Sequence, residues 1–243
     1  MQIAILLYPG VTALDAIGPY EVLRFIPGSE LRFISREPGP IVTDSGVLVL
    51  GATHSYDETP SPDIILVPGS EANTTTAMAD AGLLKWLNGA HQTSRLTLSV
   101  CSGALILAAA GILKEHPATT HWIAQSALPQ FGAEPQRDKR IVKSGKIITA
   151  AGVSAGIDLA LSVVEEICGR ERAEIIQLLI EYDPHPPVQS GHPTKASKAV
   201  FAAARTEMLE RSKNRRNVLS VPIILWRNAI NRVRSRFGSQ GPR

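Results

Sequence analysis

The chain has 243 residues, of which 44% are apolar, and a formal net charge of +3 at neutral pH. This length fits one α/β domain, alone or with an extension, and no uninterrupted apolar run approaches the roughly 18 residues of a membrane span. Cys101 and Cys168 do not make a disulfide framework, and the N-terminus lacks the basic start and cleavage site of a signal peptide. We therefore expect a cytoplasmic protein.

The positive charge is concentrated at the C-terminal end. Residues 213–243 hold eight basic and no acidic residues, so the rest of the chain carries −5, the difference between +3 and +8. The basic tail thus gives no reason to expect that the main domain binds nucleic acid. Apolar residues of the tail recur at steps of three and four, as on one face of a helix: Ile223, Trp226, Ile230, Val233 and Phe237.

These patterns predict a domain over residues 1–211 and a basic amphipathic extension over residues 212–243. A helix of this kind can contact a membrane surface or a partner. The alternative is a helix packed loosely on the parent domain, or a solvated extension.

In chain order, strand patterns alternate with helix patterns. Short apolar runs of the kind buried in parallel sheets are separated by a helix, a hairpin and a second helix. The strands are predicted at Ile3–Leu7, Leu31–Ile34 and Asp63–Val67, the helices at Leu14–Leu23 and Leu83–His91, and the hairpin at Ile41–Leu50. The alternation predicts an α/β fold, a mostly parallel sheet sandwiched by helices.

The most informative stretch is an apolar strand, Leu96–Val100, that runs into Cys101 and then a helix beginning at Ser102. A nucleophile at a sharp strand-to-helix turn is the elbow geometry of α/β hydrolases. A helix N-terminus lowers the pKa of a thiol, and the Ser102 N–H is placed to stabilise negative charge on a substrate. The alternative is a small buried residue at a strand end.

The second half of the chain continues the α/β pattern. We expect a helix over 122–131, a strand pair over 141–143 and 147–149, a long helix ending near Cys168, which we interpret as buried and inert, and another helix over 172–181. Residues 183–193 hold many prolines and are predicted to be a loop, and a last domain helix is expected over 195–216.

Other candidate site residues follow strands at their carboxyl ends, where open α/β sheets bind ligands. Asp15 follows the first strand, and Gly69 and Ser70 follow the strand 63–67. A helix N-cap is the alternative role for Asp15. The chain has neither a His-Glu-x-x-His pattern nor a glycine-rich phosphate loop, so we expect no metal and no cofactor.

Six segments, in this order, resemble the ThiJ/PfpI superfamily, which has the flavodoxin-like fold of class I glutamine amidotransferases. They are Leu14-Asp15-x-x-Gly18-Pro19-x-Glu21-Val22-Leu23, Val67-Pro68-Gly69, Ser99-Val100-Cys101-Ser102-Gly103, Ala118-Thr119-Thr120-His121-Trp122, Ser154-Ala155-Gly156-Ile157-Asp158 and Glu181-Tyr182-Asp183-Pro184-x-Pro186-Pro187. The pattern is most similar to the isonitrile hydratase-like branch, which is related to the N-terminal domains of AraC-type regulators.

The resemblance implies a cysteine-dependent, cofactor-independent hydro-lyase that converts isonitriles, its small-molecule substrates, to N-substituted formamides. Cys101 would be the nucleophile and Asp15 the acidic residue beside it, with the N–H groups of Gly69, Ser70 and Ser102 as an oxyanion-type site. His121 would orient a water or line the pocket, or simply pack beside Trp122. The resemblance also implies a homodimer.

The chain departs from the superfamily pattern in three ways. Many relatives have glycine in place of Ser70, and hydratase-like members often have threonine in place of Ser102. No histidine follows Cys101, and neither His185 nor His192 has a glutamate two residues on, so a Cys-His-Glu triad is not expected.

Two other functions fit the same pattern. One is a ligand- or redox-sensing domain without turnover, although the tail is too short for the two helix-turn-helix units of AraC-type regulators. The other is a different cysteine-dependent activity of the superfamily, such as that of a glyoxalase or deglycase.

Overall fold

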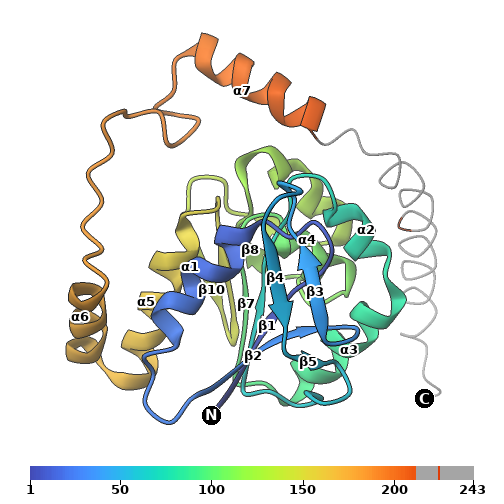
Figure 1. Ribbon diagram of the computed structural model, residues 1–243. Helices are drawn as coiled ribbons and strands as arrows, with labels where there is room; N and C mark the ends of the chain where they lie inside the picture. The colour runs from blue at the N-terminus through green and yellow to red at the C-terminus, as the bar shows by residue number, and fades with distance from the viewer. Residues whose placement is uncertain (212–223, 225–243) are drawn as a thin grey trace, which may run out of the picture.

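The computed structural model describes residues 1–211 and residue 224. At its centre is a seven-stranded sheet in the order β10-β11-β7-β6-β1-β2-β5 (Figure 1). All neighbours in it are parallel except β10 and β11. Its strands are β1 (Gln2–Leu6), β2 (Glu30–Ser35), β5 (His54–Ser55), β6 (Ile64–Val67), β7 (Leu96–Ser99), β10 (Ile141–Ser144) and β11 (Ile147–Ala150).

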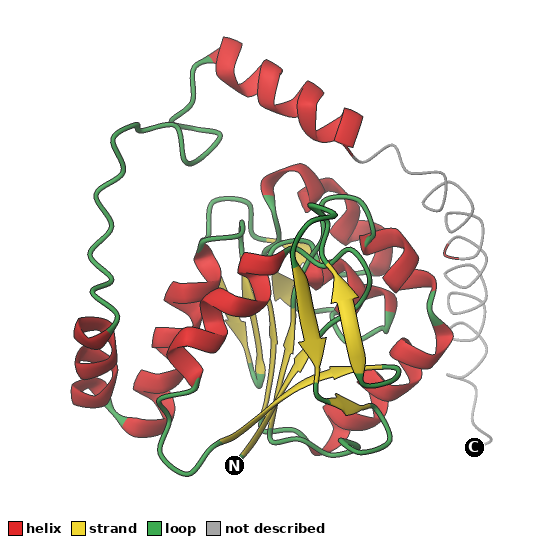
Figure 2. Ribbon diagram, viewed as in Figure 1, coloured by secondary structure: helices red, strands yellow, loops and turns green. Residues whose placement is uncertain are grey.

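Helices cover both faces of this sheet, as Figure 2 shows in red. On one face α1 packs beside α5, which in turn contacts α6; on the other, α4 contacts α2, α3 and the 3₁₀ helix η1. The helices are α1 (Ala13–Leu23), α2 (Thr74–Ala79), α3 (Ala81–Thr93), α4 (Gly103–Ala109), η1 (Trp122–Phe131), α5 (Ala155–Cys168), α6 (Arg170–Leu179) and α7 (Lys198–Arg211). The predicted α/β sandwich is confirmed.

The core lies along the central strands. Every residue of β6, β7 and β11 is buried, because these strands have helices on both sides. The predicted elbow strand is therefore flanked by two other fully buried strands, β6 and β11. The carboxyl ends of β1, β6 and β7 consequently form a rigid edge on which a site can be built.

Two small sheets lie outside the central one. The predicted hairpin is the antiparallel pair β3 (Gly39–Val42) and β4 (Val49–Ala52). The pair β8 (Pro117–Ala118) and β9 (Glu134–Pro135) was not predicted, since two residues are too few to show a strand periodicity. The expected helix over 122–131 is a 3₁₀ helix with Pro129 inside it, and proline cannot donate the backbone bond of an α-helix.

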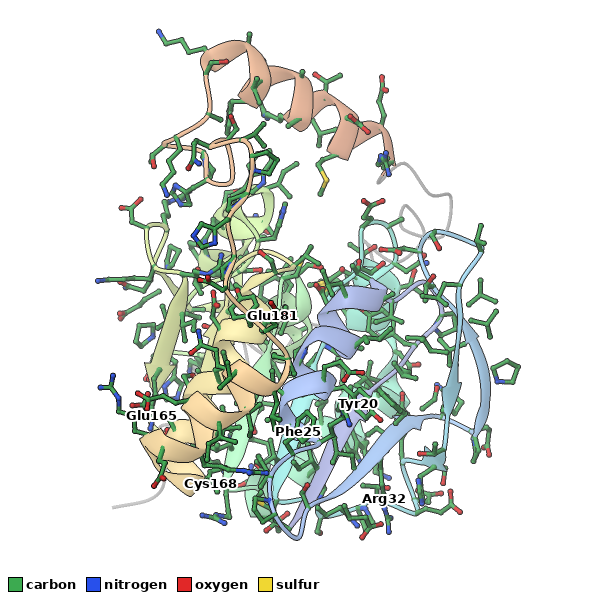
Figure 3. All side chains as sticks on the ribbon, turned by 60° about the vertical axis from the view of Figure 1, so that its left-hand side comes forward. Tyr20, Phe25, Arg32, Glu165, Cys168 and Glu181 are labelled. Carbon is green, nitrogen blue, oxygen red and sulfur yellow. The ribbon has the colours of Figure 1, made fainter. Side chains whose placement is uncertain are left out.

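The last described segment stands apart from the layers. After α6, Glu181 has φ 49°, and exposed chain leads to α7, which has no buried residue and lies away from the sheet in Figures 1 and 3. Phe201 of α7 contacts Trp122 with ring centroids 5.2 Å apart, and Arg211 forms an ion pair with Glu71.

The predicted last helix begins at Lys198 instead of Lys195, and its end at Arg216 falls outside the described residues. The amphipathic extension predicted over 212–243 also lies outside them, Ile224 excepted. Among the helices that the structure describes, none is long and apolar enough to cross a membrane.

Candidate active site

Cys101 occupies the predicted elbow between β7 and α4. Its φ is 57°, a left-handed conformation that side-chain-bearing residues adopt at a cost of roughly 1–3 kcal/mol. Both backbone groups of the residue are held: its N–H donates to the Ala151 carbonyl at 2.8 Å, and its carbonyl accepts from the Thr120 hydroxyl at 2.7 Å. The surrounding strands thus keep the strained turn in place.

Two glycines allow the elbow to pack closely against β6. A Cβ added to Gly103 would lie 2.1 Å from the Val67 carbonyl oxygen, and one added to Gly69 would lie 2.6 Å from the Ser102 backbone nitrogen. Both contacts are with backbone atoms, which have little room to move. Any side chain at either position would therefore separate the two strand ends that carry the site.

Asp15, in the first turn of α1, is fully buried and lies beside Cys101. Its Oδ2 accepts from the Gly69 N–H at 2.9 Å, while the buried Oδ1 has no hydrogen-bond partner among the described residues. Burial raises the pKa of Asp15 to about 7, although the Gly69 N–H and the Cys101 side chain act in the opposite direction. Asp15 is not the helix N-cap, which is Thr12.

The electrostatics at Cys101 differ from the sequence expectation. Burial and the charge of Asp15 raise the pKa of the thiol well above its ordinary value, and the Ser102 backbone N–H lowers it. The predicted helix-terminus effect is present, but desolvation outweighs it because the residue is only 7% exposed. Asp15 and Cys101 therefore titrate as a coupled pair in which the carboxyl group loses its proton first.

Ser102 and Ser70 form hydrogen bonds with each other, so the Ser70 N–H is not free to bind a substrate. The Ser70 N–H donates to the Ser102 hydroxyl oxygen at 3.0 Å, and that hydroxyl donates to the Ser70 carbonyl at 3.1 Å. With the Gly69 N–H engaged by Asp15, the expected oxyanion donors at 69 and 70 are both occupied. Of the expected donors, Ser102 acts on the sulfur, through both its backbone N–H and its side chain.

Thr74 and Tyr8 belong to the site but were not predicted. The Thr74 hydroxyl lies 2.7 Å from the Ser102 hydroxyl and donates to the Ser70 carbonyl at 2.9 Å. The buried Tyr8 hydroxyl donates to the Pro68 carbonyl at 3.1 Å. The sequence signal for Tyr8 is its position directly after the first strand, the same criterion that selected Asp15.

His121 is half-buried at the rim of the elbow. It follows Thr120, whose hydroxyl holds the Cys101 carbonyl, and its ring lies against Gly152 and Trp122. Burial lowers the pKa of His121, so the ring is neutral at pH 7, and its buried Nδ1 has no partner among the residues described.

The second cysteine is remote from this edge. Cys168 is the last residue of α5 and lies at the lower end of the molecule in Figure 3. The first turn of α5 lies near the elbow, because Gly156 packs against Val100. Cys168 is partly exposed, so the expected burial is not complete. Within the described part of the chain, no group of three or more His, Cys, Asp or Glu side chains is placed to hold a metal ion.

Comparison with known proteins points to one family. The profile described as "DJ-1/PfpI family" matches residues 1–166. An isonitrile hydratase of Pseudomonas putida is 37% identical over 228 residues, which are 90% of this chain and 99% of that protein. A crystal structure of a ThiJ/PfpI family protein from Pseudomonas syringae is 35% identical, covers 90% of each chain and superposes with a TM-score of 0.84. Drosophila melanogaster DJ-1beta, 19% identical with a TM-score of 0.67 over 75% of this chain and 98% of its own, shares the fold.

Proposed function

Because the chain belongs to the DJ-1/PfpI family, we propose that it is a cysteine-dependent hydro-lyase that converts isonitriles, R–N≡C, and water to N-substituted formamides. The observation that carries the proposal is the buried pair of Cys101 and Asp15, with one carboxyl oxygen left unpartnered. The 37% identity to an isonitrile hydratase along nearly the whole of that protein supports the substrate class.

The singly protonated pair rests with its proton on Cys101, because the Asp15 carboxyl group is the stronger acid. In the active form this proton has moved to Asp15, and Cys101 is the thiolate. The sulfur attacks the terminal isonitrile carbon while Asp15 protonates that carbon, which gives a thioimidate, R–N=CH–S–Cys. The Ser102 N–H stabilises the thiolate before attack. Asp15 is suited to the role because its pKa of about 7 lets it donate and regain a proton near neutral pH.

Water completes the cycle. Asp15, now a carboxylate, takes a proton from the water that adds to the thioimidate carbon, and passes it to the substrate nitrogen. The tetrahedral adduct then collapses: its hydroxyl proton goes to Asp15, the C–S bond breaks, and R–NH–CHO leaves with the thiolate restored. One water is consumed, the pair regains its single proton, and the steps need no cofactor.

His121 is proposed to line the substrate path, since it is neutral and lies at the rim of the elbow. Gly69 and Ser70 support the site through Asp15 and Ser102 instead of binding the substrate. We further propose that the protein acts in the cytoplasm as a homodimer without binding nucleic acid.

The test is turnover of alkyl and aryl isonitriles, with formamide detected by NMR. We expect activity in the wild type, none in Cys101→Ala, and a loss of 100-fold or more in Asp15→Asn, the scale of general acid–base catalysis. Cys168→Ala, which removes the remote thiol, is the matched control and should keep full activity.

Three outcomes would contradict the proposal. Saturable isonitrile binding without formamide would favour a sensor, and turnover of methylglyoxal but not of isonitriles would favour a glyoxalase or deglycase. Full hydration by Cys101→Ala or Asp15→Asn would refute the mechanism.

A further inference from the structure

Tyr8 is a buried polar group that the proposed mechanism does not use. It follows β1 at the carboxyl edge of the sheet, is 6% exposed, and donates its hydroxyl hydrogen to the Pro68 carbonyl at 3.1 Å. A buried hydroxyl without a partner costs about 1–3 kcal/mol, so this bond, together with a hydrogen bond to the Thr74 side chain, accounts for the ordered phenol. It does not account for the choice of acceptor.

That acceptor belongs to the peptide group that holds the candidate acid. The Pro68 carbonyl and the Gly69 N–H are the two ends of one planar unit, so fixing the oxygen also fixes the direction of the N–H. The Gly69 N–H donates to Asp15 Oδ2 at 2.9 Å. Tyr8, the Pro68–Gly69 peptide and Asp15 therefore form one continuous chain of hydrogen bonds.

Hydrogen bonds in such a chain polarise one another. A donor on the carbonyl oxygen withdraws electron density from the peptide nitrogen and makes its N–H a better donor. We propose that Tyr8 is a positioning residue that orients and polarises the Pro68–Gly69 peptide toward Asp15, and so tunes the acidity of that carboxyl group.

The other groups around Asp15 act differently. Asp44, from the loop between β3 and β4, opposes ionisation of Asp15 through its charge, and Cys101 shares the coupled titration. Tyr8 itself stays a neutral donor throughout the working range, because burial and then the charges of Asp15 and Cys101 raise the pKa of its phenol. Its influence on Asp15 is thus exerted by a hydrogen bond, and removal of the hydroxyl changes no charge.

The direction in which loss of the Tyr8 hydroxyl should shift the Asp15 pKa follows from the hydrogen bond between the Gly69 N–H and Asp15. The Gly69 N–H lowers the pKa of Asp15, so weakening that donor should raise the pKa further. Turnover depends on this shift only if the proposed hydratase mechanism is right, whereas the titration itself can be read in a protein with no activity at all.

The experiment is a ¹³C NMR titration of protein labelled at the aspartate carboxyl carbon, with the Asp15 signal identified by its loss in Asp15→Asn. Tyr8→Phe should raise the apparent pKa of Asp15 by roughly half a unit to one unit, a three- to tenfold fall in its acid dissociation constant. Tyr56→Phe is the matched control, because Tyr56 is a mostly buried tyrosine that stacks on Trp86, and it should shift nothing.

A second arm covers the case in which Tyr8→Phe fails to fold. Incorporation of 3-fluorotyrosine into the triple variant Tyr20→Phe, Tyr56→Phe, Tyr182→Phe leaves Tyr8 as the labelled site. The fluorinated phenol keeps the shape and is a stronger donor, so the Asp15 pKa should fall relative to the unfluorinated triple variant. An Asp15 titration unchanged in folded Tyr8→Phe, or unchanged by fluorination, would overturn the proposal and leave Tyr8 as a packing residue.

Discussion

A carboxyl group with no solvent contact makes the stability of this protein depend on pH. The pKa of Asp15 rises from 3.8 to about 7 on folding, so the native state holds a proton that the unfolded state has lost between those values. Stability must then fall as pH rises from about 4 to about 7 and remain low above that range. The full effect of a three-unit shift is on the order of 4 kcal/mol.

Asp15→Asn should therefore stabilise the protein at alkaline pH. The amide keeps an oxygen that accepts from the Gly69 N–H and cannot ionise. We expect it to unfold at higher urea concentration than the wild type, with a gain of about 1–3 kcal/mol at pH 8 that shrinks by pH 5. Asp57→Asn removes an exposed carboxylate and serves as the control. An Asn variant less stable than the wild type at pH 8 would refute this account of Asp15.

The same residue sets the pH dependence of the proposed activity. The productive state of the pair holds one proton, so below the pKa of Asp15, about 7, the doubly protonated pair accumulates. We expect kcat/KM for an isonitrile to fall about tenfold per pH unit below 7 and to level off above it. A profile from pH 5 to 9 tests this. An acid limb near pH 4 would mean that Asp15 is not the group being titrated.

Sequence reasoning predicted Cys101 and Asp15, because each directly follows or closely follows a buried strand and lies in a family motif. It predicted a lowered pKa for the Cys101 thiol, whereas burial raises that pKa. The exposure of a residue cannot be predicted from a strand–turn–helix pattern. Thr74 was missed because α2 has only six residues, too short for a helical periodicity. Tyr8 was missed because an aromatic residue after an apolar strand is normally a packing residue.

At the scale of elements, the close packing of α4 against β6 depends on the absence of a side chain at Gly103. Gly103→Ala would place its Cβ 2.1 Å from the Val67 carbonyl oxygen, closer than any real contact. Because both partners are backbone, we expect a loss of roughly 3 kcal/mol or more in the free energy of unfolding, at the upper end of overpacking effects.

The matched control for this variant is Gly89→Ala, in the exposed face of α3. A Cβ there has nothing within 4 Å, so the substitution should stabilise the helix by about 0.5–1 kcal/mol. Urea unfolding of both variants gives the comparison. Equal stabilities would show that the elbow is not closely packed in solution.

The order and type of most elements could be predicted, because strand and helix periodicities in this chain are long and well separated. What could not be predicted was set by contacts distant in sequence. The pair β8 and β9, for example, joins residues that lie 17 positions apart in the sequence, as Pro117 with Glu134.

At the scale of the whole molecule, the α6 side has an apolar surface. A groove of about 450 Å³ between α1, α5 and α6 is lined by Leu14, Ile17, Ile157, Leu179 and Ile180 among others. Leu178 is 80% and Leu179 60% exposed. Contiguous exposed apolar residues of this kind are typical of interaction surfaces, and they fit the proposed homodimer.

We expect light scattering to give a mass close to twice 26.1 kDa at micromolar concentration. Leu179→Glu should shift the protein toward the monomer, because it places a charge on the apolar surface. Val47→Glu, at an 87% exposed position in the loop between β3 and β4, is the control and should leave the dimer intact. A monomeric wild type, or dissociation by Val47→Glu alone, would contradict this interface.

The strand order also has a kinetic consequence. Neighbouring strands β1 and β6 pair residues about 60 positions apart, as Ile3 with Ile64. The thiol, the carboxyl group and the Gly69 peptide follow three different strands, β7, β1 and β6, with the carboxyl group in the first turn of α1. Such non-local pairing makes folding slow, because each chain loop must close before its contacts form. No local segment can assemble the nucleophile and its acid alone. In a refolding experiment, protection of Cys101 from a thiol-labelling reagent should therefore appear together with the native central sheet. The rate at which Cys101 becomes protected then measures the rate of the final assembly step.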